Sequence, residues 1–144
     1  LANKNNWPVL VLTNQSGIAR EMFSSEQLEK IHSFLTDELD KRGAQVNKFY
    51  HCSYHPSGSH KKYAYKSMLR KPNPLMSIIA AEEFNIDIER SFMVGDKISD
   101  ALIGVGLKTC LIKSKYIESN IMNKNINLYN SHEDLFQFFK NEID

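Results

Sequence analysis

The sequence predicts an α/β fold with a mostly parallel sheet, and two observations carry that prediction. Short apolar runs alternate along the chain with helix-period patterns, and each run is followed by glycine or small polar residues. Strands that alternate with helices are joined by right-handed crossovers and pair in parallel. Ligands of such folds bind beyond the carboxyl ends of the strands, so candidate site residues are expected directly after each strand.

The first half of the chain predicts two strands with one helix between them. The apolar run at residues 9–12 is typical of a strand covered on both faces, and residues 46–50 form a second, shorter run. Between the two runs, Ser24 and Gln27 have the spacing of a capping box. Leucine and isoleucine then recur at helical spacing, which predicts a helix over residues 25–41.

The second half of the chain predicts two more strands and three helices. Asn73 is expected to cap a helix with Pro74 in its first turn, and Ser131 is expected to cap the last helix. The asparagine-rich residues 120–130 are expected to be irregular. The strands are expected at residues 91–94 and 109–112, and the helices at residues 74–83, at residues 99–105 and after Ser131.

The composition fits one soluble domain over residues 1–144. A chain of 144 residues with 42% hydrophobic content can bury a core of its own. The 18 basic and 17 acidic residues are spread along the chain, so the charge pattern indicates neither a nucleic acid nor an anionic membrane as partner. Cys52 and Cys110 are too few for a disulfide framework, and no apolar stretch is long enough for a membrane helix. We therefore expect a cytoplasmic protein.

The turn after the third expected strand is the first candidate site. Gly95 is followed by Asp96 and Lys97, which places a carboxylate in a tight turn, and Mg²⁺ prefers such oxygen ligands. Asp100, one helical turn further on, can order this loop or accept a hydrogen bond from Lys97. The alternative is that Asp96 and Asp100 only cap or flank the helix that follows.

Two further segments supply groups that can bind an anion. Arg70 and Lys71 precede a helix N-terminus, whose free N–H groups also favour anions. Thr13 and Asn14 follow the first strand and can donate to phosphate oxygens. Taken alone, each segment is equally compatible with solvated surface cations or with an ordinary turn.

Taken together, three segments resemble the haloacid dehalogenase-like phosphatases. They are Thr13-Asn14-Gln15-Ser16-Gly17-Ile18-Ala19-Arg20, Arg70-Lys71-Pro72-Asn73-Pro74, and Val94-Gly95-Asp96-Lys97 with Asp100, and they look like the second, third and fourth motifs of that family. The resemblance extends over residues 9–112. It implies a Rossmann-like three-layer sandwich with a mostly parallel sheet, in which the strand that carries the first motif is missing from this sequence.

The resemblance also implies a mechanism. Family members use one aspartate to attack phosphorus, a second aspartate to protonate the leaving group, and Mg²⁺ to bridge the nucleophile and the phosphate. By resemblance, Thr13 and Lys71 hold the transferring phosphoryl group and Asp96 is the Mg²⁺ ligand. The residues implied to line or support the substrate site are Asn14, Arg70, Lys97 and Asp100.

Two features depart from the family pattern. The opening Asp-x-Asp-Gly motif, which supplies the nucleophile and the general acid, does not occur in the sequence. The chain also begins at leucine, so we expect a domain truncated at its amino terminus whose 144 residues alone are inactive. Family members often carry a zinc loop with Cys-x-His and Cys-x-Cys pairs, and here only Cys52 of those ligands is present, so the four-ligand zinc site is not expected. A site formed by Cys52 with His51, His55 or His60 is the alternative. The loop is then expected to be held by the packing of Tyr54, Tyr63, Tyr65 and Met68.

Residues within the motifs favour one substrate class. Family members that act on histidinol phosphate tend to have Asp-Gly-Leu after Thr-Asn-Gln and Gly-Asp-Arg in the last motif, whereas this chain has Ser16, Ile18 and Lys97 in these segments. The resemblance therefore implies removal of the 7-phosphate from D-glycero-D-manno-heptose 1,7-bisphosphate, a lipopolysaccharide precursor, by a monomeric enzyme. Histidinol phosphate or another small monoester is the alternative substrate. A phosphate- or partner-binding chain without turnover is the alternative of another class.

Overall fold

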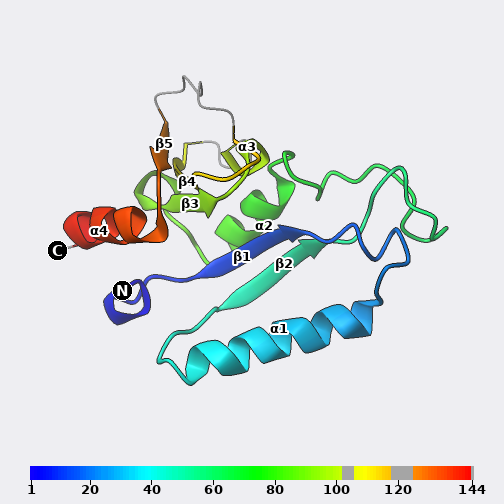
Figure 1. Cartoon of the computed structure of the whole chain (residues 1–144), viewed down its shortest axis with the longest axis horizontal. Coiled ribbons are helices and arrows are strands. Elements are labelled where there is room, and N and C mark those ends of the chain that lie inside the picture. Colours follow the sequence, from blue (N-terminus) through cyan, green and yellow to red (C-terminus); the bar gives the residue numbers. More distant parts are fainter. Residues whose placement is uncertain (102–105, 118–124, 144) are drawn as a thin grey trace. The chain divides into compact units, whose positions relative to one another are not determined.

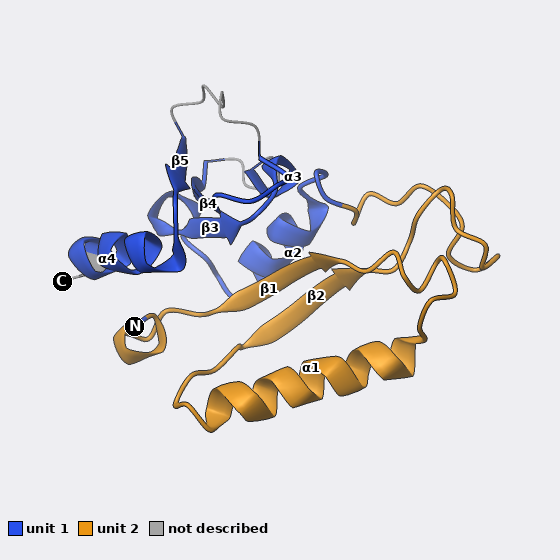
Figure 2. Ribbon diagram, in the orientation of Figure 1, with its two compact units in different colours: residues 1, 71–144 blue, residues 2–70 orange. Residues whose placement is uncertain are grey.

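The structure is a computed structural model that describes residues 1–101, 106–117 and 125–143 (Figure 1). The chain divides into two compact units, one of residues 2–70 and one of residues 71–144 together with Leu1 (Figure 2). Each unit contains a parallel sheet of its own, and the parallel pairing agrees with the predicted α/β class. The assignment of residues 1–144 to one domain stays a prediction. Among the described residues, no helix is both long and apolar enough to cross a membrane.

Two parallel strands form the sheet of residues 2–70. β1 (Leu10–Asn14) and β2 (Lys48–Cys52) pair along their whole length, and Asn14 lies opposite Cys52. Both strands end two residues later than the apolar runs indicate, because parallel pairing continues through their polar carboxyl ends. The pairing places the residues that follow the two strands at the same edge of this sheet.

A single helix, α1 (Ser25–Asp40), connects these two strands. It begins with the predicted capping box, in which the Ser24 hydroxyl accepts from the backbone N–H of Gln27 at 3.2 Å and the Gln27 side chain accepts from the backbone N–H of Ser24 at 2.8 Å. Leu28 is the buried residue of the helix. A short 3-10 turn, Asn3–Asn5, precedes β1.

Three parallel strands form the sheet of the second unit. In the order β3, β4, β5, they span Phe92–Gly95, Lys108–Ile112 and Ile126–Tyr129. The first two agree with the predicted strands at residues 91–94 and 109–112. The third corrects the expectation that residues 120–130 are irregular. Its residues pair in register with β4, with Thr109 opposite Ile126, and only one of its four residues is asparagine. Residues 120–124 of that segment lie outside the described residues.

Three helices accompany this sheet, α2 (Leu75–Glu83), α3 (Ile98–Ala101) and α4 (His132–Ile143). The Asn73 side chain accepts from the backbone N–H of Leu75 at 3.2 Å, and the Ser131 hydroxyl accepts from the backbone N–H of Asp134 at 3.1 Å. The predicted cap at Ser131 is therefore present, whereas α2 begins one residue later than predicted, with Pro74 at the N-cap position and Asn73 before it. α3 begins one residue before the predicted start, and residues 102–105 of the predicted helix lie outside the described residues. A 3-10 turn, Ile88–Arg90, precedes β3.

The core of the second unit lies around β4. Thr109, Cys110 and Leu111 are at most 1% exposed, because this strand has a neighbouring strand on each side. α4 adds an aromatic cluster, in which Phe92 meets Phe138 and Phe139 edge to face at centroid distances of 5.8 and 5.1 Å. Burial of β4 and the contacts of Phe92 with α4 thus hold β3 and β4, the strands that precede the candidate site, in place.

Candidate functional site

The turn after β3 is organised by a single carboxylate. Asp100 is 4% exposed, and its Oδ2 accepts from the backbone N–H groups of Asp96 and Lys97 at 3.3 and 3.2 Å. A Cβ atom on Gly95 would collide with this carboxylate, so the position requires glycine. The acid one helical turn after Asp96 therefore fixes the backbone of the loop that presents Asp96.

The other oxygen of the same carboxylate holds a lysine. Lys71 Nζ donates to Asp100 Oδ1 at 2.7 Å, and the two side chains are 12% and 6% exposed. A nearly buried ion pair needs further hydrogen bonds to offset the loss of hydration, and the two backbone N–H groups supply them. Because both oxygens of Asp100 are engaged, its geometry is that of a positioning residue for Lys71 and for the Asp96 loop.

Asp96 and Lys97 remain accessible in this arrangement. Both residues are exposed, and the Asp96 carboxylate has no hydrogen-bond partner or ion pair among the described residues. Within the described ranges no group of three or more His, Cys, Asp or Glu side chains could hold a metal. Asp96 can therefore contribute one oxygen ligand. Mg²⁺ is often held by one or two carboxylates with substrate phosphate and water, so the donor fits that ion without defining a complete protein site.

The segment after β4 supports the same loop, and the sequence reasoning missed it. The Ser114 hydroxyl donates to the backbone oxygen of Asp96 at 2.6 Å and accepts from the backbone N–H of Tyr116 at 3.1 Å. Lys97 Nζ lies 4.8 Å from the centre of the Tyr116 ring, within the range of a cation–π contact. The signal was available, because β3 and β4 are parallel neighbours whose following residues meet at one edge.

The residues after β1 form a second polar set, in the unit of residues 2–70. Thr13 and Asn14 are the last residues of the strand, and the Thr13 hydroxyl accepts from the Gln15 side chain at 3.0 Å. The backbone N–H of Gln15 donates to the Cys52 carbonyl at 2.8 Å, which ties the end of β1 to the end of β2. Both sequence-predicted residues therefore stand at the carboxyl edge of this sheet.

The turn that continues from Thr13 is internally packed. A Cβ atom on Gly17 would overlap the Phe23 ring, and Ile18 and Ala19 are 3% and 0% exposed. These residues of the motif therefore shape the turn. Arg20, which follows them, is exposed.

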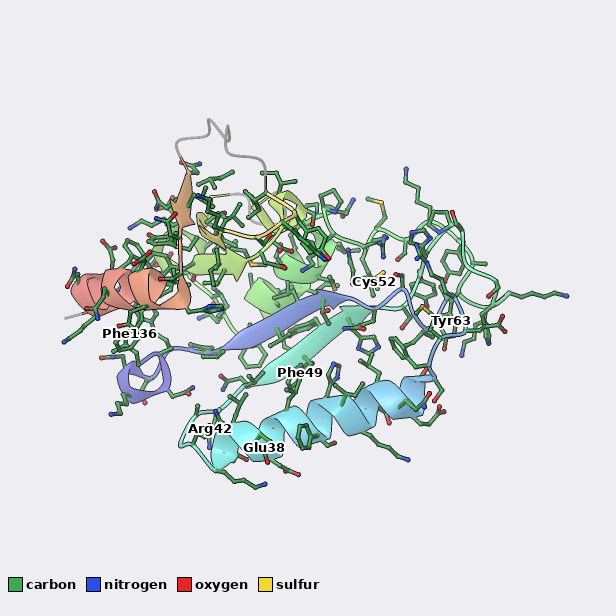
Figure 3. All side chains as sticks on the ribbon, viewed as in Figure 1. Glu38, Arg42, Phe49, Cys52, Tyr63 and Phe136 are labelled. Atoms are coloured by element: carbon green, nitrogen blue, oxygen red, sulfur yellow. The ribbon has the colours of Figure 1, made fainter. Side chains whose placement is uncertain are left out.

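The loop after β2 is built on tyrosines, as the sequence predicts. Figure 3 shows Cys52 at the end of β2 and Tyr63 in the loop that follows. Cys52 is 0% exposed, and the Tyr54 ring lies 5.5 Å from that of Tyr63 and 4.5 Å from that of Tyr65. Met68 is 61% exposed, so its packing contribution is small. The expectation that Cys52 and its surroundings form no four-ligand zinc site stays a prediction.

The predicted site residues thus fall into two sets. Lys71, Asp96, Lys97 and Asp100 gather within the second unit, whereas Thr13, Asn14 and Arg70 belong to residues 2–70. Whether the two sets act on one ligand stays a prediction.

Parallel strands with polar residues at their carboxyl edges place the chain in the class of Rossmann-like α/β proteins. A model of the HAD-hydrolase-like family matches residues 68–124, which include Lys71 and the Asp96 loop. Over 109 residues the chain is 40% identical to D-glycero-beta-D-manno-heptose-1,7-bisphosphate 7-phosphatase of Pasteurella multocida, which covers 74% of this chain and 59% of that protein. Over 143 residues it is 34% identical to the protein of the same name from Escherichia coli K12, covering 96% of this chain and 75% of that one. The chain therefore belongs to the haloacid dehalogenase-like phosphatase family.

A solved structure shows the same fold. D,D-heptose 1,7-bisphosphate phosphatase from B. bronchiseptica, crystallised with magnesium and phosphate, aligns with a TM-score of 0.83 at 22% identity. The alignment covers 98% of this chain and 78% of that one. The predicted α/β class is confirmed. The chain spans less than two thirds of the length of the Pasteurella relative.

Proposed function

We propose that the whole protein is a Mg²⁺-dependent phosphatase that removes the 7-phosphate from D-glycero-D-manno-heptose 1,7-bisphosphate. The observation that carries this proposal is the Asp100 carboxylate, which holds Lys71 Nζ at 2.7 Å and two backbone N–H groups of the Asp96 turn. The Asp100 carboxylate thus holds the Lys71 ammonium group in place. The Asp96 carboxylate, four residues before Asp100, stays exposed and can bind a ligand. The names of the curated relatives support the substrate, and the magnesium and phosphate of the B. bronchiseptica structure support the ion.

Each polar residue then has a role in handling the phosphoryl group. Lys71 and Thr13 hold the transferring oxygens, and the charge of Lys71 reduces the repulsion between these oxygens and an anionic nucleophile. Asp96 is the residue of this chain that would hold Mg²⁺, an ion that neutralises charge on phosphoryl oxygens when bound. The residues proposed to line the substrate site are Asn14, Arg70 and Lys97.

The nucleophile is proposed to come from a segment outside these 144 residues. The sequence contains no Asp-x-Asp-Gly motif, and the relatives are longer than the matched regions. An aspartate of that segment attacks phosphorus, the sugar oxygen leaves with a proton from a second aspartate, and water then hydrolyses the aspartyl-phosphate. We place the reaction in the cytoplasm, in the supply of lipopolysaccharide precursors, and in a monomer.

Phosphate release by the whole protein tests the proposal. It should hydrolyse the heptose bisphosphate with a kcat/KM at least tenfold above that for histidinol phosphate, and Lys71→Ala should lower kcat by orders of magnitude. A preference for histidinol phosphate would move the proposal to the alternative substrate. Near-normal turnover by Lys71→Ala would contradict the role of that lysine, and turnover by the 144 residues alone would contradict a nucleophile outside them.

A further inference from the structure

An exposed apolar stripe runs along α1. Ile31, Phe34 and Leu35 recur at helical spacing, and all three side chains are exposed, that of Phe34 to 62%. Leu28 is the buried residue of the same helix, so α1 packs on its own unit through another side and leaves this stripe open. Contiguous large apolar side chains on a surface indicate an interaction site.

The second half of α1 adds a groove to this stripe. The groove has a volume of about 410 Å³, and its walls are Phe34, Leu35, Glu38, Leu39 and Arg42. Figure 3 shows Glu38 and Arg42 at this end of the helix. Because three of the walls are apolar and two are charged, the groove can receive an aromatic ring between charged neighbours.

Charged residues stand at regular intervals on both sides of Phe34. Glu26 and Lys30 lie eight and four residues before it, and Glu38 and Arg42 lie four and eight residues after it. Residues four apart on a helix are neighbours, so these side chains form one continuous row. Along the row the charges alternate in sign, with the aromatic ring in the middle.

This row is complementary to itself when two copies of α1 lie antiparallel. With the two Phe34 rings at the centre, residues equally far before and after Phe34 face each other. Lys30 of one copy then meets Glu38 of the other, Glu26 meets Arg42, and symmetry forms each pair twice. A parallel pair would instead set like charges side by side, so the charges favour the antiparallel arrangement.

The charged side chains are available for such contacts. Within the described residues, neither Lys30 nor Arg42 forms an ion pair with a carboxylate. Glu38 accepts from Lys41 at 2.6 Å through Oε1, so its other oxygen can accept from a second cation. Glu26 is exposed. A second copy can therefore bind without breaking an ion pair of the first.

We propose that this stripe is a self-association surface, on which α1 of one chain packs antiparallel against α1 of a second copy. Phe34 of each copy enters the groove of the other, and the ion pairs flank the two rings. A twofold contact closes on itself, so association stops at the dimer. A single helix pair is smaller than stable interfaces, which bury roughly 1,200–2,000 Å², so the dimer forms only at high chain concentration. The reaction proposed for a monomer needs one copy and is independent of this surface.

Sedimentation velocity measures this association. The sedimentation coefficient should rise with concentration from the monomer value towards the dimer value, for the 144-residue chain and for the whole protein alike. Lys30→Glu or Glu38→Lys should weaken association about tenfold, because like charges then face each other twice. Lys61→Glu makes the same charge change in the loop after β2 and should leave association unchanged. Equal weakening by Lys30→Glu and Lys61→Glu would overturn the surface.

Reversing both charges separates a contact between copies from damage within one copy. Lys30 and Glu38 lie about two helical turns apart, too far to pair within one helix. The double variant Lys30→Glu, Glu38→Lys re-forms both pairs between antiparallel copies and should recover the association of wild type. A double variant as weak as the single ones would overturn the antiparallel pairing. If the 144-residue chain dimerises and the whole protein does not, a further segment covers the stripe and the proposal is wrong.

Crosslinking tests the position of the twofold axis. Helix axes about 8–10 Å apart place the two Cα atoms of a residue on this axis within the about 7 Å that a disulfide allows. Phe34→Cys should therefore form a disulfide-linked dimer with oxidised glutathione, whereas Glu29→Cys, on another side of α1, should not. Cys52 and Cys110 are buried, so wild type should stay free of crosslinks. Equal crosslinking of both variants, or none, would contradict an axis at Phe34.

Discussion

The coupling between Lys71 and Asp100 can be measured by a double-mutant cycle. The two unit charges lie 2.7 Å apart with side chains 12% and 6% exposed. At an effective dielectric constant of about 20, their attraction is about 6 kcal/mol, from which the cost of dehydrating both groups is subtracted. Removing Lys71 also leaves the nearly buried Asp100 carboxylate without its ion-pair partner. We therefore expect Lys71→Met or Asp100→Leu to destabilise the second unit by about 3–5 kcal/mol each.

The double variant carries the decisive information. With both charges removed, no uncompensated ion is left, so it should be destabilised by much less than the two single variants combined, with a coupling free energy of about 2–4 kcal/mol. Asp100→Leu also removes the acceptor of two backbone N–H groups, so that variant should be the less stable of the two single ones. Urea unfolding of the 144-residue chain at constant m-value provides the free energies. Additive effects would show that the 2.7 Å pair is not coupled and would refute the reasoning.

Two further predictions concern the edge and the core of the same unit. Ser114→Ala removes the hydroxyl that donates to the Asp96 carbonyl, and Tyr116→Leu removes the ring that contacts Lys97. Each variant should raise the Mg²⁺ concentration for half-maximal activity of the whole protein severalfold. Tyr116→Phe keeps the ring and should leave that concentration unchanged. Burial raises the pKa of the Cys110 thiol. The stability that this shift contributes is complete below the pKa of an unfolded thiol, about 8.5, and is lost as the pH rises through the higher pKa of the folded state. Unfolding free energies measured from about pH 7 to about pH 10 should therefore fall more steeply for wild type than for Cys110→Ala, and equal slopes would contradict this.

The sequence predicts the elements well where local pattern and tertiary pairing agree. The capping box at Ser24 and the cap at Ser131 fix two helix starts to the residue, because a hydroxyl at such a position has one set of backbone partners. β5 escapes the sequence prediction for the opposite reason. Its four residues, Ile-Asn-Leu-Tyr, follow an asparagine-rich stretch and are too few to show a strand pattern, and the structure reveals the strand by its pairing with β4.

For the candidate site, too, the sequence predicts the residues whose position follows from local pattern and leaves open a role that depends on a distant contact. The residues predicted from motifs, such as Asp96 and Thr13, directly follow or end strands, so chain order alone places them at the carboxyl edge. The sequence leaves the role of Asp100 open between capping the helix and ordering the loop, and the structure shows its carboxylate bound to the loop backbone and to Lys71. That choice depends on a lysine 29 residues earlier, a separation that no local pattern encodes.

The engagement of Asp100 has a consequence for the metal. A second carboxylate four residues after Asp96 invites the interpretation that both acids ligate the ion. In the structure both oxygens of Asp100 already accept hydrogen bonds, and withdrawing them would leave Lys71 and two backbone N–H groups without their acceptor. Asp96 is therefore the single carboxylate that this loop can offer, and the remaining oxygen ligands of Mg²⁺ must come from substrate, water and residues beyond this loop. The metal affinity of the 144-residue chain should accordingly be weak, because one exposed carboxylate cannot replace the hydration shell of the ion.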